Sequence, residues 1–218
     1  MDFVRGRTLE SYILRLPQQG AFDLTRQKLS IAIQLANALD YLRAHRLIHR
    51  DVKPANVFLS RPTQSAVCWT VRLGDFGVMK WGDFQASIET GTLTVTSQRG
   101  LGTLKYMSPE QAVRPKDVTV KSDIYSLGIT LYELFTGQVL ASAHHVYEVA
   151  NARRSRGNTV SRFFSLGFHL RPEDEPIGEL LLDMFLAPTG RPPIDHIRGR
   201  LEWEYERRFG GEWEYDLY

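Results

Sequence analysis

A polar segment, His49-Arg50-Asp51-Val52-Lys53-Pro54-Ala55-Asn56, directly follows a long stretch of helical spacing in this chain of 218 residues. It carries a carboxylate at Asp51, an ammonium group at Lys53 and a carboxamide at Asn56, and Pro54 prevents a continuous helix through them. Taken alone, an Asp and a Lys two positions apart most often form a solvent-exposed pair, and an Asn near a Pro most often forms a turn. The segment therefore predicts a polar loop whose chemistry depends on the rest of the chain.

A second acidic residue, in Asp75-Phe76-Gly77, follows a run of β-type residues nineteen positions after Asn56. Asn56 and Asp75 both offer oxygen ligands, and Mg²⁺ is typically held by one or two carboxylates together with substrate phosphates. In such a site Asp51 would accept the proton of an incoming hydroxyl, and Lys53 would neutralise charge on the transferred phosphoryl group. These groups are what phosphoryl transfer requires, because its catalysis rests on positioning and electrostatic stabilisation.

The order of short motifs along the chain resembles that of eukaryotic-type protein kinases. Residues 49–56 are similar to the catalytic loop of that family, and Asp75–Gly77 is similar to its magnesium-binding triplet. Further matching motifs are Gly102-Thr103, Ser108-Pro109-Glu110, Ser122-Asp123-Ile124-Tyr125-Ser126-Leu127-Gly128, and Arg191, which would pair with Glu110. Any one tripeptide is a weak signal, but their order over residues 49–191 indicates a Ser/Thr protein kinase.

The resemblance implies a role for each matching position, with ATP and Mg²⁺ as cofactors and a protein as substrate. The implied roles are catalytic base for Asp51, a mark of the Ser/Thr class for Lys53, magnesium ligands for Asn56 and Asp75, and the floor beneath adenine for Phe58. Lys53, Asn56 and Asp75 would also contact the nucleotide.

The resemblance also separates regulatory from structural groups near the catalytic loop. Arg50 would pair with a phosphate on the activation loop, for which Thr96 or Ser97 is the predicted acceptor. The alternative, that these hydroxyls are merely solvated, stays open. His49 and Asp123 are expected to be buried hydrogen-bonding groups that hold the loop.

The opening residues Met1–Gly6 look like the hinge of a kinase, where the backbones of Asp2 and Val4 would bond adenine. No glycine-rich phosphate loop, third-strand lysine or partner glutamate stands before them, so we expect a C-terminal lobe without its N-terminal lobe. The expected division is a hinge remnant at 1–7, the kinase C-lobe at 8–208 and a tail at 209–218.

A C-lobe without its N-lobe would lack the groups that hold ATP, and this affects the expected activity of the chain. Productive positioning can be worth about 7–11 kcal/mol of a barrier, whereas a general base contributes about 10²–10⁴-fold. An intact Asp51 would therefore not rescue an ATP that nothing grips, and we expect the isolated chain to be inactive. The alternative is a catalytically silent protein-binding module that uses the C-lobe surface.

The expected fold class is mainly α: a kinase-like helical bundle with a small β-hairpin and no N-lobe sheet. The spacing of apolar residues predicts helices over 8–16, 25–45, 122–135, 143–153, 176–186 and 192–208, and strands over 57–59 and 69–73. The segment 122–135 is apolar almost all round, which is typical of a buried central helix.

The subfamily is less sharply indicated. Residues 102–111 and the long activation loop look similar to the kinases of the translation initiation factor alpha subunit, which makes that factor a predicted substrate. Other parts resemble NIMA-related and bacterial Ser/Thr kinases. Val78 and Ala150 depart from the translation-factor group.

Composition bears on the kinds of partner, the disulfides and the cellular location that we expect. Lys and Arg number 27 against 25 Asp and Glu, a net charge of +2, so no nucleic-acid partner is implied. The single cysteine, Cys68, excludes an intrachain disulfide. The longest apolar run is too short for a bilayer, so we expect no membrane partner and a cytoplasmic location.

Overall fold

The structure is a computed structural model, and it describes part of the chain in detail. The described residues are 6–16, 23–60, 69–75, 105–114, 118–138, 140 and 170–211. The elements run in the order β1 (Arg7–Thr8), α1 (Leu9–Ile13), α2 (Arg26–Ala44), η1 (Pro54–Asn56), β2 (Val57–Ser60), β3 (Thr70–Leu73), α5 (Pro109–Val113), α6 (Val120–Thr136), η4 (Pro172–Asp174), α9 (Glu175–Met184), η5 (Pro188–Gly190) and α10 (Ile194–Phe209), where η denotes a short 3₁₀ helix.

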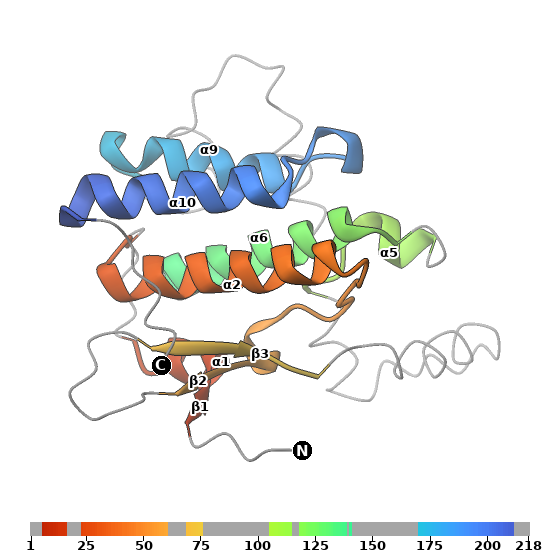
Figure 1. Cartoon of the computed structure of the whole chain (residues 1–218), viewed down its shortest axis with the longest axis horizontal. Helices are drawn as coiled ribbons and strands as arrows, with labels where there is room; N and C mark the ends of the chain where they lie inside the picture. Colours follow the sequence, from red (N-terminus) through yellow and green to blue (C-terminus); the bar gives the residue numbers. More distant parts are fainter. Residues whose placement is uncertain are drawn as a thin grey trace.

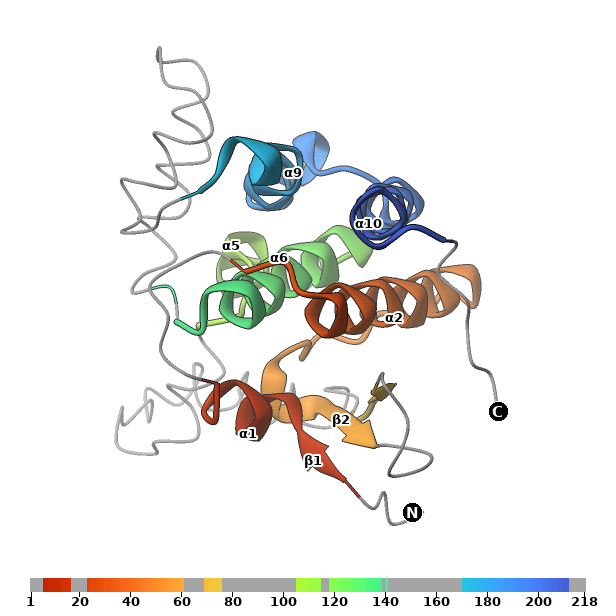
Figure 2. The same ribbon diagram turned by 90° about the vertical axis from the view of Figure 1, so that its left-hand side faces the viewer.

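The described elements lie in three layers. Helices α9 and α10 form one outer layer, α2 and α6 form the middle, and the small sheet with α1 lies on the other side (Figures 1 and 2). Helix α6 contacts both α2 and α9, and α10 packs along α2. The described part of the chain is therefore mainly helical with a small sheet, as the sequence predicts.

Helix α6 is the central element of this arrangement, because all of its residues from 122 to 136 are buried. Its N-terminus is closed by a capping box between Thr119 and Ser122, and it ends at Gly137, whose φ of 72° suits glycine. A Cβ at Gly128 would lie 2.8 Å from the Phe185 ring, so this glycine allows the end of α9 to pack closely on α6. The expectation of a central buried helix over 122–135 is confirmed.

The sheet is larger than the predicted hairpin. Strands β2 and β3 pair antiparallel with Val57 opposite Leu73, which confirms the hairpin, and β1 adds a third antiparallel strand with Arg7 opposite Leu59. The sequence interpretation placed Arg7 in a hinge remnant and did not predict its pairing in the sheet, since a strand of two residues shows no alternation. A Cβ at Gly6 would lie 2.0 Å from the Leu59 carbonyl oxygen, so glycine permits this close approach.

The other predicted helices are found with shifted ends. The helix expected over 8–16 covers only Leu9–Ile13, with Thr8 as its N-cap, and Thr25 precedes α2 as predicted. The helices expected over 176–186 and 192–208 appear as α9 and α10. The helix expected over 143–153 lies outside the described residues. None of the helices in the described ranges combines the length and the apolar character that crossing a membrane requires.

Candidate active site

The loop at residues 49–56 leaves α2 and is anchored on α6 by one buried carboxylate. The backbone N–H groups of His49 and Arg50 each donate to Asp123, at 2.8 Å, and Asp123 is only 2% exposed. Burial raises the pKa of Asp123 to about 6, and the two N–H donors act against that rise by favouring the ionised form. These contacts agree with the structural role expected for His49 and Asp123.

Within the loop, three side chains named by the sequence interpretation are in direct contact. The Lys53 ammonium lies 2.9 and 3.0 Å from the two carboxylate oxygens of Asp51. The Asn56 amide donates to the Asp51 backbone carbonyl at 2.8 Å and to its carboxylate at 2.9 Å. Lys53 and Asn56 therefore converge on Asp51, which is 7% exposed.

The fourth residue, Asp75, directly follows Gly74, whose backbone contacts both ends of the loop. The Gly74 N–H donates to the Asn56 carbonyl at 3.0 Å, and its carbonyl lies 3.2 Å from His49 Nε2. Because the Asp51 N–H donates to His49 Nδ1, Nε2 must carry the proton of the neutral ring. Burial lowers the pKa of His49, which favours that neutral form. Asp75 itself is exposed, with a left-handed φ of 59°.

The residues present fit a magnesium ion. Both acceptor oxygens of Asp51 accept hydrogen bonds from the nitrogen of the Asn56 amide, so Asn56 Oδ1 faces away from them and would be the atom that binds a cation. The described residues contain no group of three or more His, Cys, Asp and Glu suited to a metal. A cation here would accordingly depend on Asn56, Asp75 and substrate phosphates, the arrangement that Mg²⁺ commonly uses.

Phe58, the predicted floor of the adenine site, lies on β2 and is half-buried. A Cβ on Gly74 would come within 2.9 Å of its ring, so glycine leaves room for the aromatic side chain there. The other predicted nucleotide contacts, Asp2 and Val4, lie outside the described residues, as do Thr96 and Ser97.

The predicted ion pair between Glu110 and Arg191 is present and joins α5 to the segment after η5, while Ser122 joins Glu110 to α6. The two side chains make paired hydrogen bonds, one of them 2.9 Å between Arg191 Nη2 and Glu110 Oε2, and Ser122 donates to Glu110 at 2.9 Å. Burial alone would raise the pKa of Glu110, but Arg191 and Ser122 hold it below its ordinary value. The guanidinium also lies 5.0 Å from the centre of the Tyr125 ring.

The sequence interpretation missed two contacts around the site. The Gln111 amide donates to the Arg50 carbonyl at 2.9 Å, and the Tyr106 hydroxyl donates to the Glu133 carboxylate at 2.5 Å. Burial raises the pKa of both Tyr106 and Glu133. The available signal was Glu133, a carboxylate within an otherwise apolar segment, whereas no local pattern marks Gln111.

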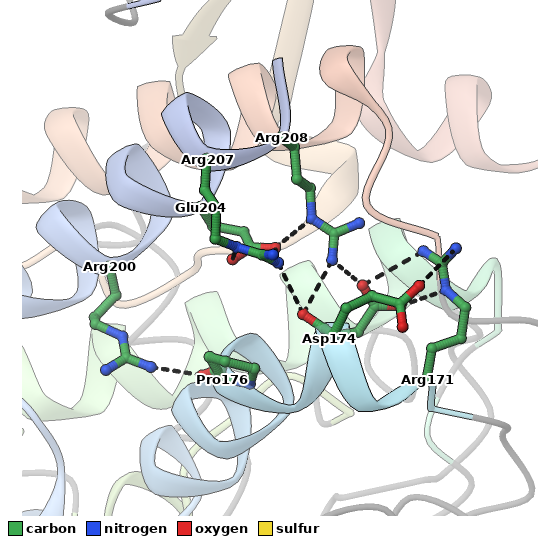
Figure 3. A network of polar contacts seen from close by, with 8 residues as sticks. Arg171, Asp174, Pro176, Arg200, Glu204, Arg207 and Arg208 are labelled. Atoms are coloured by element: carbon green, nitrogen blue, oxygen red, sulfur yellow. Dashed lines mark hydrogen bonds and ion pairs between the residues drawn. The ribbon is translucent and has the colours of Figure 1, made fainter. Parts of the chain in front are cut away.

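A second polar cluster lies at the far end of the molecule from the sheet. We call it the helix-end network: Arg171, Asp174, Glu204, Arg207 and Arg208 (Figure 3). Arg208 bridges the carboxylates of Asp174 and Glu204, and Arg207 binds Glu204 at 2.6 and 3.0 Å. Arg171 binds Asp174 at 2.9 Å. Both carboxylates are fully buried, so this network joins the end of α10 to the start of α9.

Comparison with known proteins places these features in context. Residues 1–182 match the model of the protein kinase domain. Similar proteins include the probable serine/threonine-protein kinase PknB of Lactococcus lactis, 39% identical over 64% of this chain and 19% of its own length. PknB of Mycobacterium leprae is 30% identical over 88% of this chain and 30% of its own length, and PrkC of Bacillus subtilis is 34% identical over 64% and 19%.

The matched segment thus spans less than a third of each of these relatives. Their names support a Ser/Thr kinase and do not support the translation-factor subfamily that the sequence suggested.

Proposed function

This chain belongs to the protein kinase domain family, and we propose that it supplies the catalytic-loop part of an active site that transfers the γ-phosphoryl group of ATP to a serine or threonine of a protein. The observation that carries the proposal is the convergence of Lys53 and Asn56 on Asp51, with Gly74, the residue before Asp75, hydrogen-bonded to Asn56.

In this proposal Asp51 is the base that takes the proton of the incoming hydroxyl. Its carboxylate is held from two directions by Lys53 and Asn56, so its orientation is set before substrate arrives. Lys53 then neutralises charge on the transferred phosphoryl group, because its ammonium already lies within 3.0 Å of the base. A silent binding module would have no need of this arrangement.

Asn56 and Asp75 would hold the magnesium ion. When bound, it supplies positive charge that binds and orients the phosphates of ATP. The contribution of the chain is to keep the two ligands near each other, through the hydrogen bond from the Gly74 N–H to the Asn56 carbonyl.

Phe58 is proposed to lie beneath adenine, with Asp2 and Val4 as the backbone contacts at its edge. The grip on the phosphates is proposed to come from an N-terminal lobe whose motifs are not found within the 218 residues. The 218-residue chain by itself is accordingly expected to show no turnover above that of Asp51→Asn. The substrate class is proposed no more narrowly than serine or threonine in a protein, since the relatives give no support to a translation factor.

The proposal is tested on the whole protein, that is, the full product of the reading frame in which residues 1–218 are encoded. Transfer of labelled phosphate from ATP to a generic protein substrate is measured for wild type and for Asp51→Asn. Loss of the base should lower kcat about 10²–10⁴-fold, while the thermal unfolding midpoint changes little.

Glu206→Gln is the matched control, because it also neutralises one carboxylate but lies on the exposed face of α10. It should retain wild-type kcat. The proposal is wrong if the complete protein transfers no phosphate, or if Asp51→Asn stays within threefold of wild type.

A further inference from the structure

The backbone at Arg50, directly before Asp51, is held by side chains from two distant elements. Its N–H donates to Asp123 on α6 at 2.8 Å, and its carbonyl accepts from Gln111 on α5 at 2.9 Å. Arg50 has a φ of 68°, in the left-handed region that residues with a side chain adopt at a cost. This conformation therefore needs support from the surrounding structure.

Gln111 acts on the peptide group that leads directly into Asp51. The Arg50 carbonyl and the Asp51 N–H belong to the same peptide plane. The N–H side of this plane makes a longer contact, 3.3 Å, to His49 Nδ1. The 2.9 Å bond from Gln111 is the shorter of these two contacts, so Gln111 restrains the plane from which the Asp51 side chain departs.

The Gln111 amide is itself fixed to α5. Gln111 is 3% exposed, and its N–H donates to the Ser108 hydroxyl that caps this helix. Its neighbour Glu110 joins the ion pair with Arg191 and the hydrogen bond from Ser122. A displacement of α5 would accordingly carry the Gln111 amide away from the Arg50 carbonyl.

Packing alone does not account for a glutamine at this position. Within the described part of the chain, Gln111 Oε1 is buried and has no hydrogen-bond partner. An unpaired buried acceptor is unfavourable, so an apolar side chain of similar length would suit stability better. What Gln111 provides is its donor to Arg50.

We propose that Gln111 is a positioning residue that couples the docking of α5 to the orientation of Asp51. The inference rests on the proposed kinase function, because the orientation of Asp51 matters only if Asp51 acts in phosphoryl transfer. Asp51 is aimed at the incoming hydroxyl when α5 is seated and Gln111 holds the Arg50 peptide. When α5 is displaced, the left-handed turn at Arg50 loses one of its two supports.

The test uses Gln111→Met in the protein made from the complete reading frame. Methionine keeps the length of the side chain but removes both the donor and the unpaired oxygen. We expect kcat to fall about tenfold with KM for ATP within about twofold, and the thermal unfolding midpoint to stay equal or rise. Amide hydrogen exchange at Asp51 should become about tenfold faster, a result that does not depend on catalysis.

Gln34→Met is the matched control. Gln34 bridges α2 and the start of β3, with bonds of 2.7 Å to the Trp69 carbonyl and 2.9 Å from the Val71 N–H. Losing these two bonds should lower the unfolding midpoint more than Gln111→Met does. It should leave kcat and Asp51 exchange unchanged.

A second variant, Gln111→Glu, adds a pH signature. The introduced carboxyl can donate to the Arg50 carbonyl only when it is protonated. Its kcat relative to wild type should therefore recover as the pH is lowered from about 8 to about 6.

The inference is overturned if Gln111→Met keeps kcat within twofold and leaves Asp51 exchange unchanged. It is also overturned if Gln111→Glu shows a ratio to wild type that does not vary with pH. A complete protein without phosphotransfer would instead refute the proposed function, while faster Asp51 exchange in Gln111→Met would still support the structural coupling.

Discussion

At the end of α10, Glu204 meets two guanidinium groups and is fully buried, whereas in the catalytic loop Asp51 meets one ammonium group and one amide and is 7% exposed. The helix-end network surrounds its carboxylates with fixed positive charge, an arrangement suited to holding two helices together. The catalytic loop orients its carboxylate with fewer charges and leaves a small part of it exposed. Carboxylates paired with cations therefore hold two helices together in one region and, under the proposed function, orient a base in the other.

The two regions also differ in backbone conformation, which is regular in the helix-end network and irregular in the catalytic loop. The helix-end network is built on η4 and α10, and its Asp174 and Glu204 lie in helical turns. On the catalytic side, Arg50 and Asp75 both have left-handed φ values, 68° and 59°. Each such conformation costs a side-chain-bearing residue roughly 1–2 kcal/mol. The anchorage of the loop on α6 offsets this cost at Arg50, and a third left-handed residue, Arg46, lies just after α2.

The largest expected effect breaks the helix-end network. Glu204→Ala removes the fully buried carboxylate that Arg207 and Arg208 share, which should lower the free energy of unfolding by about 3 kcal/mol. Urea unfolding measures this change. The kcat of the folded fraction should stay at the wild-type value, in contrast to Asp51→Asn.

Glu206→Ala is the control for this comparison, because Glu206 is exposed on the same helix. It should change the free energy of unfolding by less than about 0.5 kcal/mol. If Glu204→Ala were equally mild, the helix-end network would not stabilise the fold.

The next prediction concerns how the stability that Asp123 contributes beneath the catalytic loop depends on pH. Burial raises the pKa of folded Asp123 to about 6 from its ordinary value of 3.8. At a pH between these two pKa values, Asp123 has released its proton in the unfolded chain but keeps it in the folded protein. Rising pH therefore favours unfolding. The stability contributed by Asp123 is complete below about pH 4 and is lost by about pH 6.

The measurement compares wild type with Asp123→Asn, which does not titrate. As pH rises from about 4 to about 6, wild type should lose on the order of 2–3 kcal/mol of unfolding free energy relative to the variant. A difference that stays constant over this range would show that the carboxylate beneath the catalytic loop is ionised at both ends of it.

The smallest effect concerns a carboxylate bound by a neutral group. Tyr106→Phe removes the 2.5 Å hydrogen bond to Glu133, which is 6% exposed on α6. Loss of a bond to a charged group should cost about 1.5–3 kcal/mol, reduced here toward the lower end because Glu133 can take up a proton. Thermal and urea unfolding against Tyr41→Phe, an exposed tyrosine on α2, test this. Equal stability of the two variants would contradict the prediction.

The candidate site was accessible from the sequence to the extent that its residues lie close together in the chain. Asp51, Lys53 and Asn56 fall within six positions, so a single loop brings them into contact. The pairing of Glu110 with Arg191 was predictable because both belong to recognisable motifs. The contact from Gln111 to Arg50 was not, because the positions are 61 apart and a lone glutamine carries no pattern.

Local pattern by itself determined the helical periods, the strand alternation, the loop chemistry and the family resemblance, since these depend on residues a few positions apart. Only the tertiary structure decided that β1 completes the sheet, that Gln111 holds the Arg50 carbonyl, and that Asp174 and Glu204 share Arg208. Such contacts arise when packing brings distant segments together. Which distant residues meet depends on the shape of the folded core. The spacing of residues a few positions apart does not encode that shape.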